Sequence, residues 1–130
     1  MIIDSDILIY FLKGEKRVVQ ELLKIAPNEL YTTRINYTEL LYGAYNSSKV
    51  EENLNRFRNF LDEFTILEFD EKSSEFFSKT KAKLKKDGNI IADMDLMIAS
   101  IAMANNHELV TNNHKHFKRI QQLKLIDWLA

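Results

Sequence analysis

The sequence predicts a single α/β domain, spanning residues 1–130, in which a central parallel sheet of four or five strands is flanked by helices. Short runs of apolar and β-branched residues alternate with longer stretches whose apolar residues recur at helical spacing, as in parallel strands joined by helices. No linker, repeat or low-complexity tract divides the 130 residues, and 45% of them are hydrophobic, which is enough for one core.

The predicted strands are short and are spread along the whole chain. They cover residues 1–3, 30–33, 66–69 and 108–111, with 125–127 as a fifth candidate. Helices are predicted between them, over residues 7–12, 36–44 and 51–64, in a segment that follows Asp70, and in an alanine-rich segment that begins near Asp93. Ser5 or Asp6 can cap the first of these helices, and Asn36 or Thr38 can cap the second.

Acidic side chains occupy positions where they have no core to fill. Asp4 and Asp6 follow the first strand, and Asp93 and Asp95 open the alanine-rich helix. Ligand sites in open α/β sheets lie at the carboxyl ends of strands, and Mg²⁺ and Mn²⁺ prefer carboxylate oxygens, so the first pair predicts a divalent metal site. The alternative is that both pairs only cap helices, because a helix N-terminus favours an acid in any case.

Glu39 adds weight to the metal interpretation. It lies among apolar residues of the predicted helix 36–44, where a carboxylate is costly unless it is paired, hydrogen-bonded or bound to metal. The alternative for Glu39 is a solvated place on the polar side of that helix, which Asn36 shares.

Four motifs, in order, resemble those of PIN-domain ribonucleases of the VapC toxin type. They are Ile3-Asp4-Ser5-Asp6-Ile7-Leu8-Ile9-Tyr10, then Thr38-Glu39-Leu40-Leu41-Tyr42-Gly43-Ala44, then Leu84-Lys85-Lys86-Asp87-Gly88 with Ile91-Ala92-Asp93-Met94-Asp95-Leu96-Met97-Ile98-Ala99, and finally Leu109-Val110-Thr111-Asn112-Asn113 with His116-Phe117. The closing residues 123–128 resemble the family's tail, so the resemblance covers nearly the whole chain.

The resemblance implies that Asp4, Glu39 and Asp95 bind Mg²⁺ or Mn²⁺, with Asp93 as an additional contributor. It implies an endoribonuclease toxin that hydrolyses RNA phosphodiester bonds with a water molecule that the metal activates. The implied partners are an RNA substrate, a VapB-type antitoxin and a second copy of the chain in a homodimer. Related toxins cut structured RNA such as anticodon loops of transfer RNA or loops of ribosomal RNA.

Two departures from the family pattern keep an alternative open. Asp6 stands where the family usually has asparagine, and Asn112-Asn113 replaces the fourth acid. Asn113 could still orient the attacking water, and Thr111 could add a hydroxyl contact. The alternative is a catalytically degenerate PIN domain that binds RNA or protein without cutting.

A phosphatase of the haloacid dehalogenase type also carries Asp-x-Asp after its first strand, but its following threonine or valine and glycine are absent here.

Charge and composition limit how the protein can bind RNA and where in the cell it is expected. A net charge of -1 gives no overall basic field, so RNA binding must depend on local charge. Lys79, Lys83 and Lys86 share a helical face that is usually only solvated, whereas Lys85 and Lys86 precede the Asp93 motif and could hold phosphates near it. The absence of cysteine favours a reducing cytoplasm, and the apolar runs are too short to span a membrane.

The histidines do not predict a zinc site. His114 and His116 lack a third soft ligand, so a loop or a substrate contact near Asn113 is expected there. His107 follows two asparagines and is expected in a turn.

Overall fold

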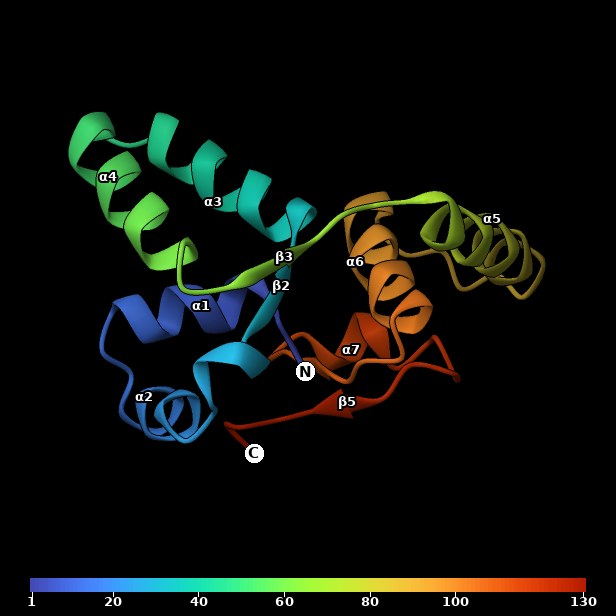
Figure 1. Cartoon of the computed structure of the whole chain (residues 1–130). Coiled ribbons are helices and arrows are strands. Elements are labelled where there is room, and N and C mark those ends of the chain that lie inside the picture. Colours follow the sequence, from blue (N-terminus) through green and yellow to red (C-terminus); the bar gives the residue numbers. More distant parts are fainter.

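The computed structural model describes all 130 residues and contains a five-stranded, all-parallel sheet in the order β3-β2-β1-β4-β5 (Figure 1). The strands are β1 (Ile2–Ile3), β2 (Tyr31–Thr33), β3 (Thr65–Leu67), β4 (Leu109–Val110) and β5 (Leu125–Ile126). The helices are α1 (Ser5–Leu12), α2 (Lys16–Leu23), α3 (Arg34–Tyr45), α4 (Val50–Leu61), α5 (Glu71–Lys86), α6 (Asp93–Ala104) and α7 (His114–Phe117), and a 3₁₀ turn covers Pro27–Glu29. The predicted α/β fold with helices flanking a parallel sheet is confirmed.

The central strands are buried on both faces, and successive residues point to opposite sides. Ile2 and Leu109 join a core with α6, α7 and the end of α5, whereas Ile3 and Val110 join a second core with α1, α2, α3 and α4. Figure 1 shows these two groups of helices on either side of the strands. This arrangement explains why the strands are short apolar runs without polar alternation.

Several element boundaries differ from the predicted ones. Asp4, rather than Ser5 or Asp6, caps α1, because the helix begins directly after β1 and Asp4 accepts the Ser5 N–H at 2.8 Å. Thr33 caps α3 in a capping box with Asn36, so the predicted cap at Asn36 or Thr38 is wrong by up to five residues. The cap of α5 at Asp70 is confirmed by a 2.9 Å bond from the Ser73 N–H.

Other boundaries moved because of strand pairing and helix length. The parallel register pairs β2 residues with 65–67, so β3 begins one residue earlier than predicted and α4 ends at Leu61 rather than at 64. The helix α7 occupies a stretch where a loop is expected, and it is too short to produce a periodic pattern. His107 lies in the predicted turn, after Asn106 with its positive φ of 55°. No helix has the length and apolar character needed to cross a membrane.

Candidate active site

Asp4 lies at the carboxyl edge of β1 and is only 6% exposed. Its carboxylate accepts hydrogen bonds from the Ser5 N–H at 2.8 Å, the Asn36 side-chain amide at 2.8 Å and the Thr111 hydroxyl at 2.7 Å. Asn36 comes from α3, and Thr111 follows β4. Three segments that are distant in the sequence therefore meet at this carboxylate, because parallel strands bring their carboxyl ends to one edge of the sheet.

Glu39 is held beside Asp4 by two short polar side chains. The Ser5 hydroxyl donates to Glu39 Oε1 at 2.7 Å, and the Asn36 side-chain amide donates to Ser5 Oγ at 2.8 Å. Asn36 is itself fixed by Thr33, whose hydroxyl donates to Asn36 Oδ1 at 2.7 Å. The cap of α3 thus determines where the Asn36 amide points, and through Ser5 it determines where the Glu39 carboxylate lies.

Asp6 ties the loop after β4 to the start of α1. Its carboxylate accepts the Ile7 N–H at 2.7 Å and the Asn112 N–H at 3.0 Å. The Asn113 N–H donates to Thr111 Oγ1 at 3.0 Å, so the loop is held from both sides. Asp6 stands where the family usually has asparagine, and it holds in place the segment Asn112-Asn113, which replaces the family's fourth acid.

Asp95 approaches the cluster from the first turn of α6, with a side chain that is 22% exposed. His116 Nδ1 lies 3.5 Å from Asp95 Oδ2 and 3.2 Å from the Asn113 side-chain nitrogen. Asn113 therefore contacts His116 and Thr111, and no hydrogen bond joins it to a carboxylate. His116 thus lies beside Asn113, and the substrate contact expected there stays a prediction.

Asp93 points to a different neighbour. Its carboxylate is 61% exposed and forms an ion pair at 2.9 Å with Lys81 of α5. No hydrogen bond connects it with the residues around Asp4. His114 also turns away from His116, since its Nε2 lies 3.3 Å from Asp127 Oδ2. The two histidines do not share a site.

The carboxylates of the cluster disfavour one another's ionisation. Burial raises the pKa of Asp4 to about 7, and the charge of Asp6 adds to this effect. Burial also raises the pKa of Glu39, with smaller contributions in the same direction from Asp95 and Asp6. Burial is again the main reason why the pKa of Asp6 is raised. The four acids therefore concentrate negative charge that a bound cation would offset.

The donor set fits a hard divalent cation. Its oxygens come from carboxylates, hydroxyls and amides, which suit Mg²⁺ or Mn²⁺ better than zinc. No three of the acidic or histidine side chains are gathered into a ready-made cage for an ion. Mg²⁺ usually keeps several waters and takes few protein ligands, so such a cage is not required. Asp4, Glu39 and Asp95 are the residues that could hold the cation.

Ser5 and Asn36 are the parts of this site that the sequence-based predictions leave out. Asn36 is predicted as a helix cap and as a polar neighbour of Glu39, and Ser5 is predicted as a helix cap, although both connect Asp4 with Glu39. A signal was available for Asn36, because it lies one turn before Glu39 on the same helix. Nothing local indicates that it reaches Asp4, which is 32 residues away in the sequence.

The PIN-domain family profile matches residues 1–123. Ribonuclease VapC2 of Rickettsia felis is 40% identical over 101 residues, which are 78% of this chain and 75% of the relative. This chain is a PIN-domain protein of the VapC type. Ribonuclease VapC2 of Haemophilus influenzae is 32% identical over 98% of the PIN domain and 96% of the relative. The crystal structure of VapBC2 from Rickettsia felis bound to a promoter DNA fragment matches with a TM-score of 0.90 and 34% identity, covering 98% of the PIN domain and 97% of that chain.

The metal-free PIN domain should lose stability as the pH rises. The pKa of Asp4 is about 7 in the folded state against an ordinary value of 3.8, so between these pH values the folded state binds more protons than the unfolded state. Linkage then predicts a fall of about 2 kcal/mol in the free energy of unfolding between about pH 5.5 and about pH 7.5. Urea denaturation in EDTA measures this fall.

The Asp4→Asn variant is the control for this pH dependence, because it removes the titrating group. Its free energy of unfolding should change much less over the same pH range. A wild-type protein that gains stability between the two pH values would contradict the assignment of Asp4 as the buried, destabilised carboxylate.

Proposed function

We propose that this PIN domain is a metal-dependent endoribonuclease, the toxin of a toxin–antitoxin pair. The observation that carries the proposal is the hydrogen-bonded link of Asp4 to Glu39 through Ser5 and Asn36, at the carboxyl edge of β1. Burial raises the pKa of both carboxyl groups, and the nearby charge of Asp95 contributes to the raised pKa of Glu39. The relatives named as VapC ribonucleases support RNA as the substrate.

Asp4, Glu39 and Asp95 would hold Mg²⁺ or Mn²⁺ between them. When bound, the cation lowers the pKa of a water molecule and offsets the charge that develops on the phosphoryl oxygens. Ser5 and Asn36 keep the carboxylates of Asp4 and Glu39 together through hydrogen bonds of 2.7 to 2.8 Å. The ion pair of Asp93 with Lys81 favours a structural role for that acid over ligation.

Asn113 remains the candidate for orienting the attacking water. Its position beside His116, which lies 3.5 Å from Asp95, supports a place at the rim of the cluster. An amide there can accept a hydrogen bond from water without adding further negative charge. The Asn112 N–H, which donates to the Asp6 carboxylate, holds this rim in place.

We infer that a VapB-type antitoxin binds the domain, because the similar solved structure from Rickettsia felis is a VapBC2 assembly. We also propose a homodimer in the cytoplasm. The exposed rings of Tyr42 and Tyr45 on α3 support a protein partner on that helix, since aromatic residues are enriched at interfaces.

A non-catalytic binding module is the second candidate. The observation that favours it is the replacement of the family's fourth acid by Asn112-Asn113. The cluster around Asp4 disfavours it, because a domain without catalysis gains nothing from burying a carboxylate among other carboxylates.

Incubating total RNA with the purified, antitoxin-free protein tests the proposed function. With Mg²⁺ or Mn²⁺ we expect discrete fragments, and with excess EDTA we expect intact RNA. Fragments that persist in EDTA would contradict a metal-dependent activity. Intact RNA in a sample where metal binding has been verified would favour the non-catalytic module.

A further inference from the structure

A groove that does not include the carboxylate cluster lies on the side of α5 that faces residues 119–122. It runs between α5 and the segment that leads from α7 to β5, and its volume is about 390 Å³. Only three of its 11 lining residues are hydrophobic. Three of the others, Lys79, Lys83 and Arg119, are cations, and the sole acid is Asp87.

The cations of the groove are free to bind a ligand. Lys79 and Lys83 lie one turn apart on α5 with no ion-pair partner, whereas Lys81 on the other side of the helix is paired with Asp93. Like charges at this spacing destabilise a helix unless an anion lies between them. Arg119 is anchored by a 2.7 Å bond from its guanidinium to the Ile90 carbonyl. The groove thus presents fixed and mobile hydrogen-bond donors and suits phosphate groups, which only accept hydrogen bonds.

One end of the groove lies close to the candidate active site. Arg119 follows His116 by one turn, and its N–H donates to the His116 carbonyl at 3.4 Å. His116 in turn lies 3.5 Å from Asp95. The Ile90 carbonyl that holds Arg119 belongs to the segment that leads into α6, where Asp95 is located. A single-stranded RNA that passes the carboxylates can therefore continue into the groove.

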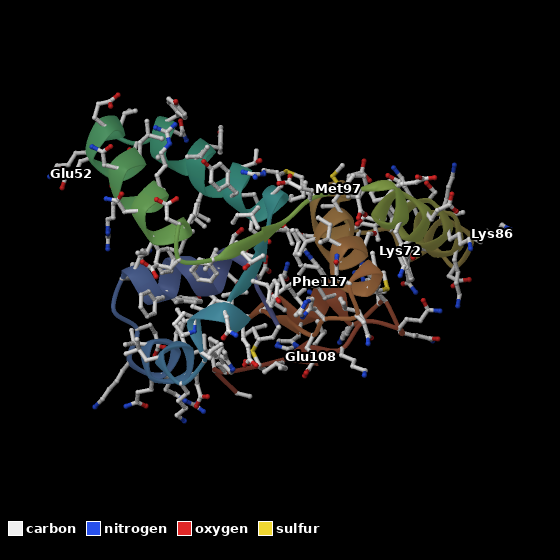
Figure 2. The ribbon with its side chains drawn as sticks, viewed as in Figure 1. Glu52, Lys72, Lys86, Met97, Glu108 and Phe117 are labelled. Carbon is white, nitrogen blue, oxygen red and sulfur yellow. The ribbon has the colours of Figure 1, made fainter.

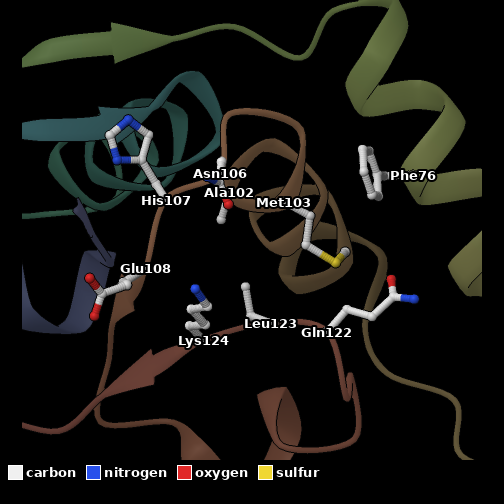
Figure 3. Close-up of a pocket in the computed structure, with 9 residues that line it drawn as sticks. All are labelled: Phe76, Ala102, Met103, Asn106, His107, Glu108, Gln122, Leu123 and Lys124. Carbon is white, nitrogen blue, oxygen red and sulfur yellow. The ribbon is translucent and has the colours of Figure 1, made fainter.

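The other end of the groove contains an aromatic ring. Phe76 and Gln122 line both the groove and a smaller hollow of about 180 Å³. Figure 3 shows these two residues on the same side of that hollow, one on α5 and one on the segment before β5, opposite His107 and Glu108. Proteins that bind single-stranded nucleic acids combine cations along the backbone with aromatic rings on which bases stack.

We propose that this groove binds the sugar–phosphate backbone of the single-stranded RNA next to the cleavage site, through Lys79, Lys83 and Arg119. The proposal rests on the proposed function, since it extends the RNA path from the carboxylate cluster. It assigns these two lysines a role that a merely solvated helix face lacks. Because phosphates carry no sequence information, the contact contributes affinity and leaves base selection to other residues.

Fluorescence anisotropy with a labelled single-stranded oligouridylate tests the groove, in EDTA so that the probe stays intact. The double variant Lys79→Ala with Lys83→Ala should bind about tenfold more weakly than the wild type, and its salt slope should be smaller by about 1.4, or about 0.7 for each lost contact. The matched control is Lys49→Ala with Lys72→Ala, which removes the same charge at two exposed lysines outside the groove. Figure 2 labels Lys72 on α5, and Lys49 directly precedes α4. The control should bind within about twofold of the wild type with an unchanged slope.

Equal weakening in both double variants would overturn the proposal, because it would reveal a general charge effect. Unchanged binding in the groove variant would also overturn it. If the wild type cuts RNA with Mg²⁺ while the groove variant binds the probe normally, the groove proposal fails and the proposed function stands. If the wild type cuts nothing while only the groove variant loses probe binding, the groove proposal stands and the proposed function fails.

Discussion

The Asp4→Asn variant should cleave RNA at least about 100-fold more slowly than the wild type, because replacing even an outer partner of a metal ligand typically costs about 10- to 100-fold. The substitution removes the charge that would bind the cation and keeps the shape of the side chain. Initial rates of fragment formation with Mg²⁺ measure the effect. The Asp62→Asn variant, which changes an exposed acid at the end of α4, is the matched control and should cut at the wild-type rate.

The fold should tolerate this substitution. The asparagine oxygen can still accept the hydrogen bond from Asn36, and the Thr111 hydroxyl can rotate to accept one from the new amide. Burial raises the pKa of the Asp4 carboxyl group to about 7, so above that pH the wild type carries a buried charge that the variant lacks. The metal-free variant should therefore be at least as stable as the metal-free wild type above that pH. Wild-type cleavage by a folded Asp4→Asn protein would contradict the site assignment.

The second large effect is expected at Asp95. The Asp95→Asn variant should also cleave RNA at least about 100-fold more slowly. A residue that only hydrogen-bonds to a metal ligand typically costs about 10- to 100-fold when it is replaced, and a ligand itself should cost at least as much. Asp95 raises the pKa of Glu39, which places the two charges near each other, and its side chain is mostly buried beside His116. Rates with Mg²⁺ under substrate excess provide the measurement.

Asp93 offers a control on the same helix, two residues away. The Asp93→Asn variant breaks an exposed ion pair with Lys81, and such a pair contributes only about 0 to 1 kcal/mol to stability. Cleavage by this variant should stay close to the wild-type rate. Equal losses at both positions would show that Asp93 belongs to the cluster and that its pairing with Lys81 is broken during catalysis.

The sequence predicts the alternation of strands and helices because burial of β1 and β4 on both faces leaves a plain apolar signal. Cap positions are harder to predict. Asp4, Ser5 and Asp6 can all cap α1, and the choice among them depends on where β1 stops pairing with β4. A helix as short as α7 leaves no periodic pattern to detect.

The acids of the candidate site can be predicted from the sequence, but the side chains that hydrogen-bond to them or contact them cannot. Carboxylates after an apolar run and inside an apolar helix stand out as costly. The bond from Asn36 to Asp4 joins residues 32 positions apart, and the contact between His116 and Asp95 depends on how α7 packs near α6. The groove of Lys79 and Lys83 could not be predicted either, because its opposite wall comes from residues 119–122.

Binding of Mn²⁺ to the RNA-free protein tests the central claim most directly, because it depends on the carboxylates alone. Titration followed by the electron paramagnetic resonance signal of free Mn²⁺ should show binding to the wild type and binding at least about tenfold weaker in the Asp4→Asn variant. Equal Mn²⁺ binding by both proteins would contradict the claim that the cluster around Asp4 is the metal site.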